Sequence, residues 1–166
     1  MAAKILINEF IEQWRKVQEG RLWMGNHFQQ KLEMISEDMA FTRPLPSLHS
    51  PAEIVAHLLA WRLDAIEKIK SGRGHLMEEH EANWPTNEEL RKKTWKQLVN
   101  QYHASQNEIM FLLRDKNDDF LEETYEDQDF AGRFSYSFML NGLLQHDVYH
   151  LGQLGIIIKL LEEQDS

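Results

Sequence analysis

Two histidines lie four residues apart in one of the most apolar stretches of the chain, LLQHDVYHLGQLGIIIKLL at residues 143–161. On a helix, this spacing places the imidazoles of His146 and His150 on one face. An imidazole that is taken out of water needs polar partners, whereas a leucine at the same position would need none. Either a hydrogen-bond network or a metal ion could supply these partners.

A third histidine has the right placement to join this pair. The helix expected over residues 51–70 carries His57 on its apolar face, four residues before Trp61. If the two helices face each other in a bundle, His57 meets His146 and His150. Three neutral imidazoles with one or more positions left open are typical of a catalytic transition-metal site rather than a closed structural one.

The alternative is that all three are ordinary core histidines bonded to carbonyl groups or waters. The chain has eight histidines, so a pair at this spacing is weak evidence by itself. Pattern alone therefore leaves both interpretations open. His27, His49 and His103 have no partner at ligand spacing, and His75 and His80 are expected in the loop after the helix over residues 51–70. We expect surface or capping roles for these five histidines.

Composition restricts the class of protein. At 166 residues with 42% hydrophobic content, the chain suits one domain over residues 1–166. Its 18 Lys and Arg against 27 Asp and Glu give a net charge of −9, which disfavours nucleic acid as a partner. Cysteine is absent, so any metal must be held by His, Asp or Glu, and any reacting thiol must come from a cosubstrate.

No segment has the pattern of a membrane or export signal. The first fourteen residues carry charges and lack an uninterrupted apolar run before a cleavage site. The run LGIIIKLL is broken by Lys159 and falls short of the roughly 20 apolar residues that a membrane span needs. We therefore expect a soluble cytoplasmic protein with no membrane partner.

Helical periodicity dominates the chain, and no strand-length alternation stands out. Ser50-Pro51-Ala52-Glu53 has the residues of a capping box with proline at the first helical position, and Thr86 with Glu89 offers a second cap. Four principal helices with an extra N-terminal helical segment predict an all-α antiparallel bundle. The expected helices cover residues 5–17, 25–36, 51–70, 87–114 and 135–163.

The acidic connection before the last helix imitates a calcium-binding loop. Residues 115–126, DKNDDFLEETYE, have acidic or amide residues at several ligand positions and a glutamate at the twelfth. The sixth position is Phe120, where the sharp turn of such a loop requires glycine, and the eighth is the acidic Glu122. We therefore expect a long solvated acidic connection and no calcium site.

Two motifs together resemble the DinB/YfiT-like superfamily of metal-binding four-helix proteins. They are HSPAEIVAHLLAWR, which contains His57, and LLQHDVYHLGQL, which contains His146 and His150. The upstream segment EGRLWMGNHFQQKLEMISEDMAFTRP extends the resemblance over nearly the whole chain. It implies an up-down-down-up bundle, a divalent metal held by His57, His146 and His150, and a homodimer.

Family relatives include transferases and isomerases that use low-molecular-weight thiols such as bacillithiol or mycothiol. The resemblance therefore suggests a metal-dependent enzyme with a small-molecule substrate, which transfers a thiol to an electrophilic substrate or hydrolyses one. The alternative is a non-catalytic, stress-related bundle in which a metal only holds helices together or mediates association. Zn²⁺ and Ni²⁺ are the leading metals for a three-histidine site, with Fe²⁺ as a further candidate.

Other residues on the last helix, close to His146 and His150, also have expected roles. Tyr149 and Gln153 lie near the histidine face and are candidates to orient a ligand or the substrate, with packing or surface roles as the alternative. Asp147 lies about 100° from His146 around the helix, so we expect it to be solvated. Gly152 and Gly155 offer small residues for the contact between two copies.

Overall fold

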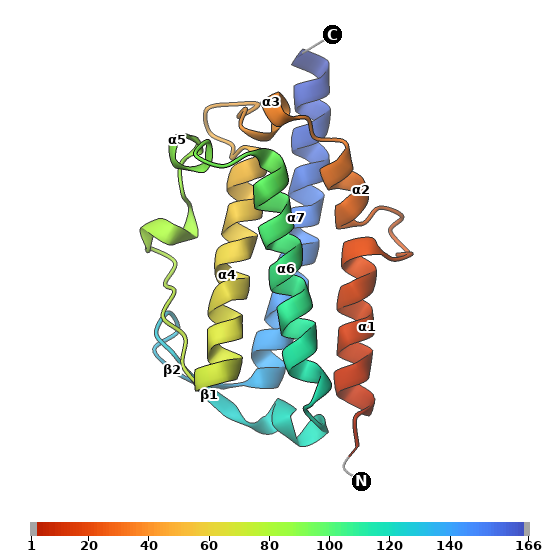
Figure 1. The fold of residues 1–166 in the computed structure, drawn as a ribbon, viewed down its shortest axis with the longest axis vertical. Helices are drawn as coiled ribbons and strands as arrows, with labels where there is room; N and C mark the ends of the chain where they lie inside the picture. Colours follow the sequence, from red (N-terminus) through yellow and green to blue (C-terminus); the bar gives the residue numbers. More distant parts are fainter. Residues whose placement is uncertain (1–2, 165–166) are drawn as a thin grey trace.

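The computed structural model describes residues 3–164 and contains a bundle of four long helices (Figure 1). Followed along the chain in Figure 1, α1 runs up, α4 and α6 run down, and α7 runs up again. This is the predicted up-down-down-up order. The four helices are α1 (Ile5–Glu19), α4 (Pro51–Ser71), α6 (Trp95–Arg114) and α7 (Tyr136–Gln164).

Helix α4 begins and ends where its sequence predicts. The Ser50 hydroxyl accepts a hydrogen bond from the Glu53 amide, and the Glu53 carboxylate accepts one from the Ser50 amide, so the capping box is formed. Pro51 occupies the first helical turn, where its missing N–H is not needed. The helix ends at Gly72, whose φ of 76° favours glycine.

Two predicted helices have different bounds in the structure. The helix expected over residues 87–114 is α5 (Asn87–Leu90) followed by a turn and α6, because Thr94 and Gln97 form a second capping box that starts a new helix. The helix expected over 25–36 is shorter than predicted, because only α2 (Phe28–Glu33) falls within it. A further short helix, α3 (Glu37–Ala40), follows outside the expected range.

The acidic connection is ordered, so the expectation of a solvated loop is wrong. After the 3₁₀ turn η2 (Asp118–Glu122) come strands β1 (Thr124–Asp127) and β2 (Gly132–Ser135), which pair antiparallel. The side chains of Tyr125 and Asp127 are buried beneath the hairpin. Burial of alternate residues on β1 stabilises this strand despite its acidic composition.

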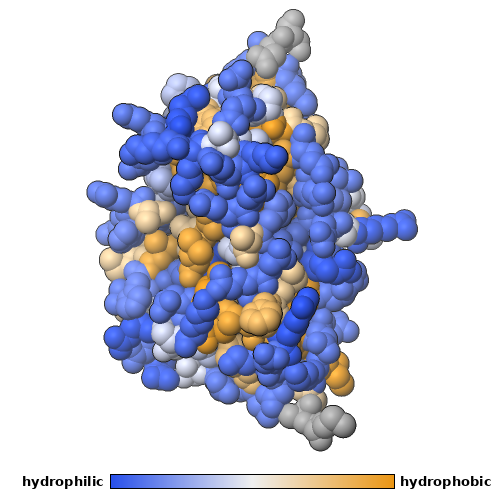
Figure 2. Space-filling model, viewed as in Figure 1, coloured by the Kyte–Doolittle hydropathy of each residue, from blue (hydrophilic) through white to orange (hydrophobic). Residues whose placement is uncertain are grey.

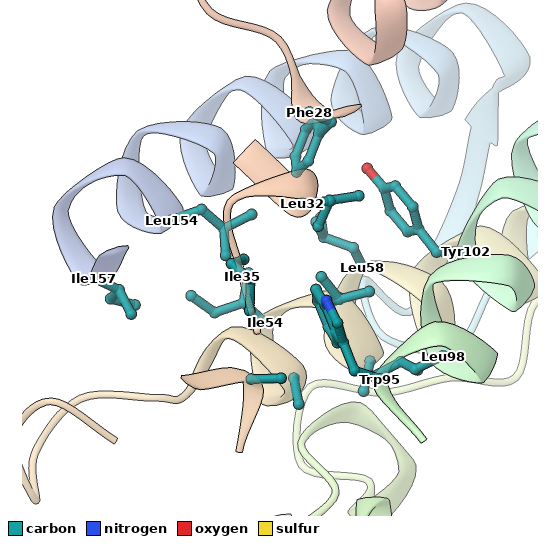
Figure 3. Packing of buried hydrophobic residues seen from close by; sticks show 14 of the residues in the cluster. Phe28, Leu32, Ile35, Ile54, Leu58, Trp95, Leu98, Tyr102, Leu154 and Ile157 are labelled. Atoms are coloured by element: carbon teal, nitrogen blue, oxygen red, sulfur yellow. The ribbon is translucent and has the colours of Figure 1, made fainter. Parts of the chain in front are cut away.

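Apolar side chains fill the bundle in two adjoining clusters. The upper cluster packs residues of α2, α4, α6 and α7 around Leu58 and Leu154 (Figure 3). The lower cluster surrounds Trp14 and Leu140. The exterior face in Figure 2 is mainly hydrophilic, with apolar side chains gathered in its middle. Within residues 3–164, no helix is long and apolar enough to cross a membrane.

A polar network lies where the two clusters meet, and every long helix contributes to it. Oδ2 of Asp147 on α7 accepts hydrogen bonds from Trp14 (2.5 Å) and Gln18 (2.8 Å) on α1 and from Arg62 (2.7 Å) on α4. Arg62 also donates to the hydroxyl of Tyr102 on α6, which donates in turn to Gln18. The network ties all four helices together.

The burial of Asp147 corrects the expectation that it is solvated, since its side chain is only 1% exposed. Helical geometry correctly places it on a different face from His146, but that face is covered by α1 and α4. A buried carboxylate must have partners, and here a buried arginine neutralises its charge.

Replacing Asp147 with alanine should destabilise the protein strongly, because Arg62 would remain as an uncompensated buried charge. We expect a loss of about 3–5 kcal/mol in the free energy of unfolding, measured by urea denaturation. The matched control is Glu163→Gln, which removes an acidic side chain from an exposed position on the same helix. Similar stabilities for the two variants would contradict the role of the network.

Candidate metal centre

The structure brings three predicted site histidines together. His57 lies on α4, and His146 and His150 lie on α7. Nε2 of His146 is 2.9 Å from Nε2 of His57 and 3.0 Å from Nε2 of His150. Among the described residues, the group of ligand atoms around this point contains only these three side chains.

The outer nitrogens of two rings have fixed partners. Nδ1 of His57 donates to the carbonyl oxygen of Asn83 at 3.1 Å, and Nδ1 of His150 donates to Oε1 of Gln153 at 2.6 Å. In a neutral ring with its proton on Nδ1, Nε2 carries a free lone pair. His57 and His150 therefore both direct a lone pair toward His146.

This arrangement fits a cation better than a hydrogen-bond network. Nε2 of His146 carries at most one hydrogen, so it can donate to His57 or to His150 but not to both. At least one of the two short contacts then has no hydrogen between its two nitrogens. A divalent cation bound by the three Nε2 atoms would satisfy all of them.

Burial keeps the rings neutral, which is the form that binds metal. Desolvation, with a smaller contribution from neighbouring histidines, lowers the pKa of His57 to about 4 and that of His146 to about 3. Desolvation also lowers the pKa of His150.

His57 also contacts two loop residues, Asn83 and Trp84, that sequence reasoning missed. The ring of Trp84 stacks on His57 with centroids 3.8 Å apart and also on His49 at 3.9 Å. Asn83 supplies the carbonyl for His57 from the preceding 3₁₀ turn η1 (Glu81–Asn83). His49, expected at the surface, therefore belongs to the wall of the site.

A cavity of about 600 Å³ adjoins the three histidines. Trp61 forms part of its wall. Gln153 contacts His150 directly, whereas Tyr149 lines the cavity with an exposed side chain whose ring lies edge-on to His150. His75 and His80, predicted to lie in a loop, are not among the residues that line this cavity.

The sequence matches the family model of the DinB superfamily over residues 23–154. This match covers most of the chain and includes all three histidines. The chain belongs to the DinB superfamily. A search of curated proteins by sequence finds no significant match.

Several solved structures share the fold. The mycothiol-dependent maleylpyruvate isomerase matches with a TM-score of 0.68 and 14% identity, covering 90% of this chain but 60% of the isomerase. A DinB-like protein from Bacillus subtilis matches with a TM-score of 0.62 and 15% identity, covering 95% of this chain and 91% of that one.

YfiT from Bacillus subtilis, described as a probable metal-dependent hydrolase with an unusual four-helix bundle topology, matches with a TM-score of 0.55. Its identity is 12%, and the match covers 99% of this chain and 91% of YfiT. At such identities, the likeness shows the shared bundle, and the chemistry of this DinB-superfamily chain must be argued from its own residues.

Without bound metal, the protein should lose stability as the pH falls below about 6.5. An unfolded histidine binds a proton near that pH, whereas folded His57 and His146 stay neutral to about pH 4 and 3. Their contribution is therefore complete above pH 6.5 and is lost toward pH 4, with a slope of at most about 1.4 kcal/mol per pH unit for each ring.

Urea unfolding of chelator-treated protein at pH 7, 6 and 5 would measure this slope. His146→Gln should reduce it, whereas His75→Gln, which changes an exposed loop histidine, should leave the contribution of the buried rings intact. An equal slope in wild type and His146→Gln would contradict the burial of a neutral His146.

Proposed function

We propose that His57, His146 and His150 bind one divalent metal ion and that the protein is a metal-dependent enzyme acting on a small molecule. The observation that carries the proposal is the convergence of three Nε2 atoms at the wall of a large cavity. Zn²⁺ and Ni²⁺ are the leading metals, and Fe²⁺ fits the same ligands.

The site has the form of an open metal centre. Because the described residues add no fourth protein ligand to the group, at least one coordination position would face the cavity. Three neutral ligands would leave the full charge of the ion available to lower the pKa of bound water to about 7 or to hold a thiol as its thiolate.

The chain's own residues would position these groups. Gln153 and the Asn83 carbonyl fix the tautomers of His150 and His57, and Trp84 covers one ring. Since the chain has no cysteine, a thiolate would come from a low-molecular-weight cosubstrate. Thiol transfer to an electrophile and hydrolysis are therefore the reactions we propose.

The descriptions of two structural neighbours support these two classes of reaction. One is a mycothiol-dependent isomerase, and another is described as a metal-dependent hydrolase. The second candidate function, a non-catalytic bundle with a structural metal, would be favoured by a sealed site. The cavity beside the three histidines favours the enzyme.

Replacing His57 with alanine should remove most of the metal, because two imidazoles on one helix would remain. Protein purified without a metal-affinity tag should contain about one metal ion per subunit, measured by elemental analysis. His75→Ala is the matched control, since its side chain is exposed in the loop after α4. Full metal content in folded His57→Ala protein would contradict the assignment.

Catalysis should depend on the same ligands. Protein loaded with metal would be screened with a panel of thiols and electrophiles and with hydrolysable esters and amides. Activity should disappear on chelation and in His146→Ala, and it should survive in His75→Ala. Undiminished activity in a sample from which the metal has been shown to be lost would reject a metal-dependent reaction.

A homodimer stays a prediction. The outer face of α7 carries exposed Tyr149 and Ile156, at 62% and 61%, on either side of Gly152. Gly152 has no atom within 4 Å of the position a Cβ would take, so a partner helix could approach closely. Light scattering should give twice the subunit mass of 19.7 kDa. A mass of one subunit at every concentration would contradict the dimer.

A further inference from the structure

Beyond the three histidines, the cavity follows one face of α4 and one face of α7. Lining residues recur at intervals of four on both helices, which keeps them on one side of each helix. They are His57, Trp61 and Ala65 on α4, and Phe138, Gly142, His146 and His150 on α7. Phe138 comes eight residues before His146, which is roughly 12 Å along the helix. A strip of cavity wall therefore leads from the histidines to Phe138.

Apart from the histidines, the side chains of this strip are apolar. Trp61 lies beside them, with its ring edge-on to His57 and 6.5 Å between the centroids. Met139 and Leu143 line the cavity from α7 as well, and both are buried. An aromatic or alkyl group gains free energy when it leaves water for such surroundings, whereas a charged group loses its hydration there.

Gly142 leaves open space in the middle of the strip. It lines the cavity, and a Cβ at this position would meet no atom within 4 Å. Glycine inside a helix is less favourable than alanine, and here no neighbouring atom requires it. The open space lies roughly 6 Å along α7 from His146, so a group attached to a molecule at the histidines would pass through it.

Three phenylalanines form an aromatic wall at the other end of the strip. Phe130 lies in the turn between β1 and β2, Phe134 lies on β2, and Phe138 lies on α7. Their ring centroids are 5.6, 5.9 and 5.1 Å apart. Phe130 and Phe138 line the cavity and are 58% and 49% exposed. Exposed apolar side chains that cluster beside a cavity are typical of a surface that binds a ligand.

The buried charged groups beside this aromatic wall already have partners. Nζ of Lys68 lies 2.7 Å from Oδ2 of Asp64 and 2.7 Å from Oδ2 of Asp127, and these side chains are at most 6% exposed. Oδ1 of Asp127 accepts the amide hydrogen of Phe130 at 3.0 Å. The ion pairs therefore hold the turn that carries Phe130, and the rings are left to contact a ligand.

The shape of the strip favours a small molecule over a second copy of the chain. The cavity has a volume of about 600 Å³, which is within the range of small-molecule sites, and it is continuous with the three histidines. A partner surface could cover Phe130 and Phe138, but it would leave the space beside Trp61 and Gly142 empty. A ligand that extends from the histidines to the aromatic wall would fill both.

We propose that the substrate carries an apolar aromatic group, a ring on a short alkyl chain, that lies along the strip while its reactive atom reaches the three histidines. This inference rests on the proposed function, because it names the substrate class of the same site. Gly142 determines the room that the group has next to the histidines. Phe138 is the principal contact of its ring.

Matched thiol probes test the proposal. Protein loaded with Co²⁺ would be titrated with 3-phenylpropane-1-thiol and with 2-(2-mercaptoethoxy)ethanol, which has a similar length but a polar chain. Calorimetry gives the affinity, and the Co²⁺–thiolate absorption band reports binding at the histidines. The phenyl thiol should bind at least about tenfold more tightly, because its ring leaves water at the aromatic wall. Ethanethiol and 2-mercaptoethanol, which are too short to reach this wall, should differ by less than about twofold.

Two variants with matched controls locate the effect. Phe138→Ser should reduce the preference for the phenyl thiol at least about threefold, whereas Phe111→Ser, which removes an exposed ring on α6 outside the lining, should retain it. Gly142→Leu should fill the open space, weaken both long thiols and spare the short ones. Asn141→Leu adds the same side chain at an exposed position outside the lining and should spare all four thiols. If Phe138→Ser fails to fold, Gly142→Leu still decides the proposal.

The outcomes separate this inference from the proposed function. Equal affinities of the two long thiols, with the thiolate band present, would overturn the aromatic substrate class while leaving the metal centre in place. So would a preference that survives both Phe138→Ser and Gly142→Leu, or a Phe138→Ser protein that differs only in its mass by light scattering. A band absent with every thiol would contradict the thiol reaction instead. In that case calorimetry with 4-phenylbutan-1-ol and tri(ethylene glycol) still decides the inference, and equal binding would overturn it.

Discussion

The buried contact between Arg62 and Asp147 is the constraint on which the bundle and its site depend. Each side chain is 1% exposed, and removing either charge from water costs several kcal/mol unless the partner is in place. Asp147 directly follows His146 on α7, and Arg62 comes five residues after His57 on α4. The contact therefore fixes the rotation of α7 against α4, which directs the imidazoles to one point.

Local signals in the sequence were sufficient for much of the fold. The capping box at Ser50 and the periodicity of the last helix gave α4 and α7 within a residue or two. The break before Trp95 was missed because the apolar stripe continues across it, although Thr94 caps a new helix there. The hairpin was missed because burial of Tyr125 depends on packing against distant helices.

The candidate site likewise has parts that local sequence predicts and parts that depend on tertiary packing. The spacing of His146 and His150, together with the resemblance, was enough to expect three histidines in one place, and the structure shows them there. Asn83 and Trp84 could not be found this way, because they lie in a loop whose path is set by tertiary contacts. Asp147 shows the limit of helical geometry, which gives the angle of a side chain but not what covers it.

X-ray absorption at the metal edge tests the central claim most directly, because it reports the ligands of the bound ion themselves. The zinc-loaded protein should show three imidazole ligands at about 2.0–2.1 Å and a further light-atom ligand. A thiol cosubstrate should replace that ligand with sulfur at about 2.3 Å. Fewer than three imidazoles, or a closed set of four protein ligands that no thiol displaces, would contradict the account.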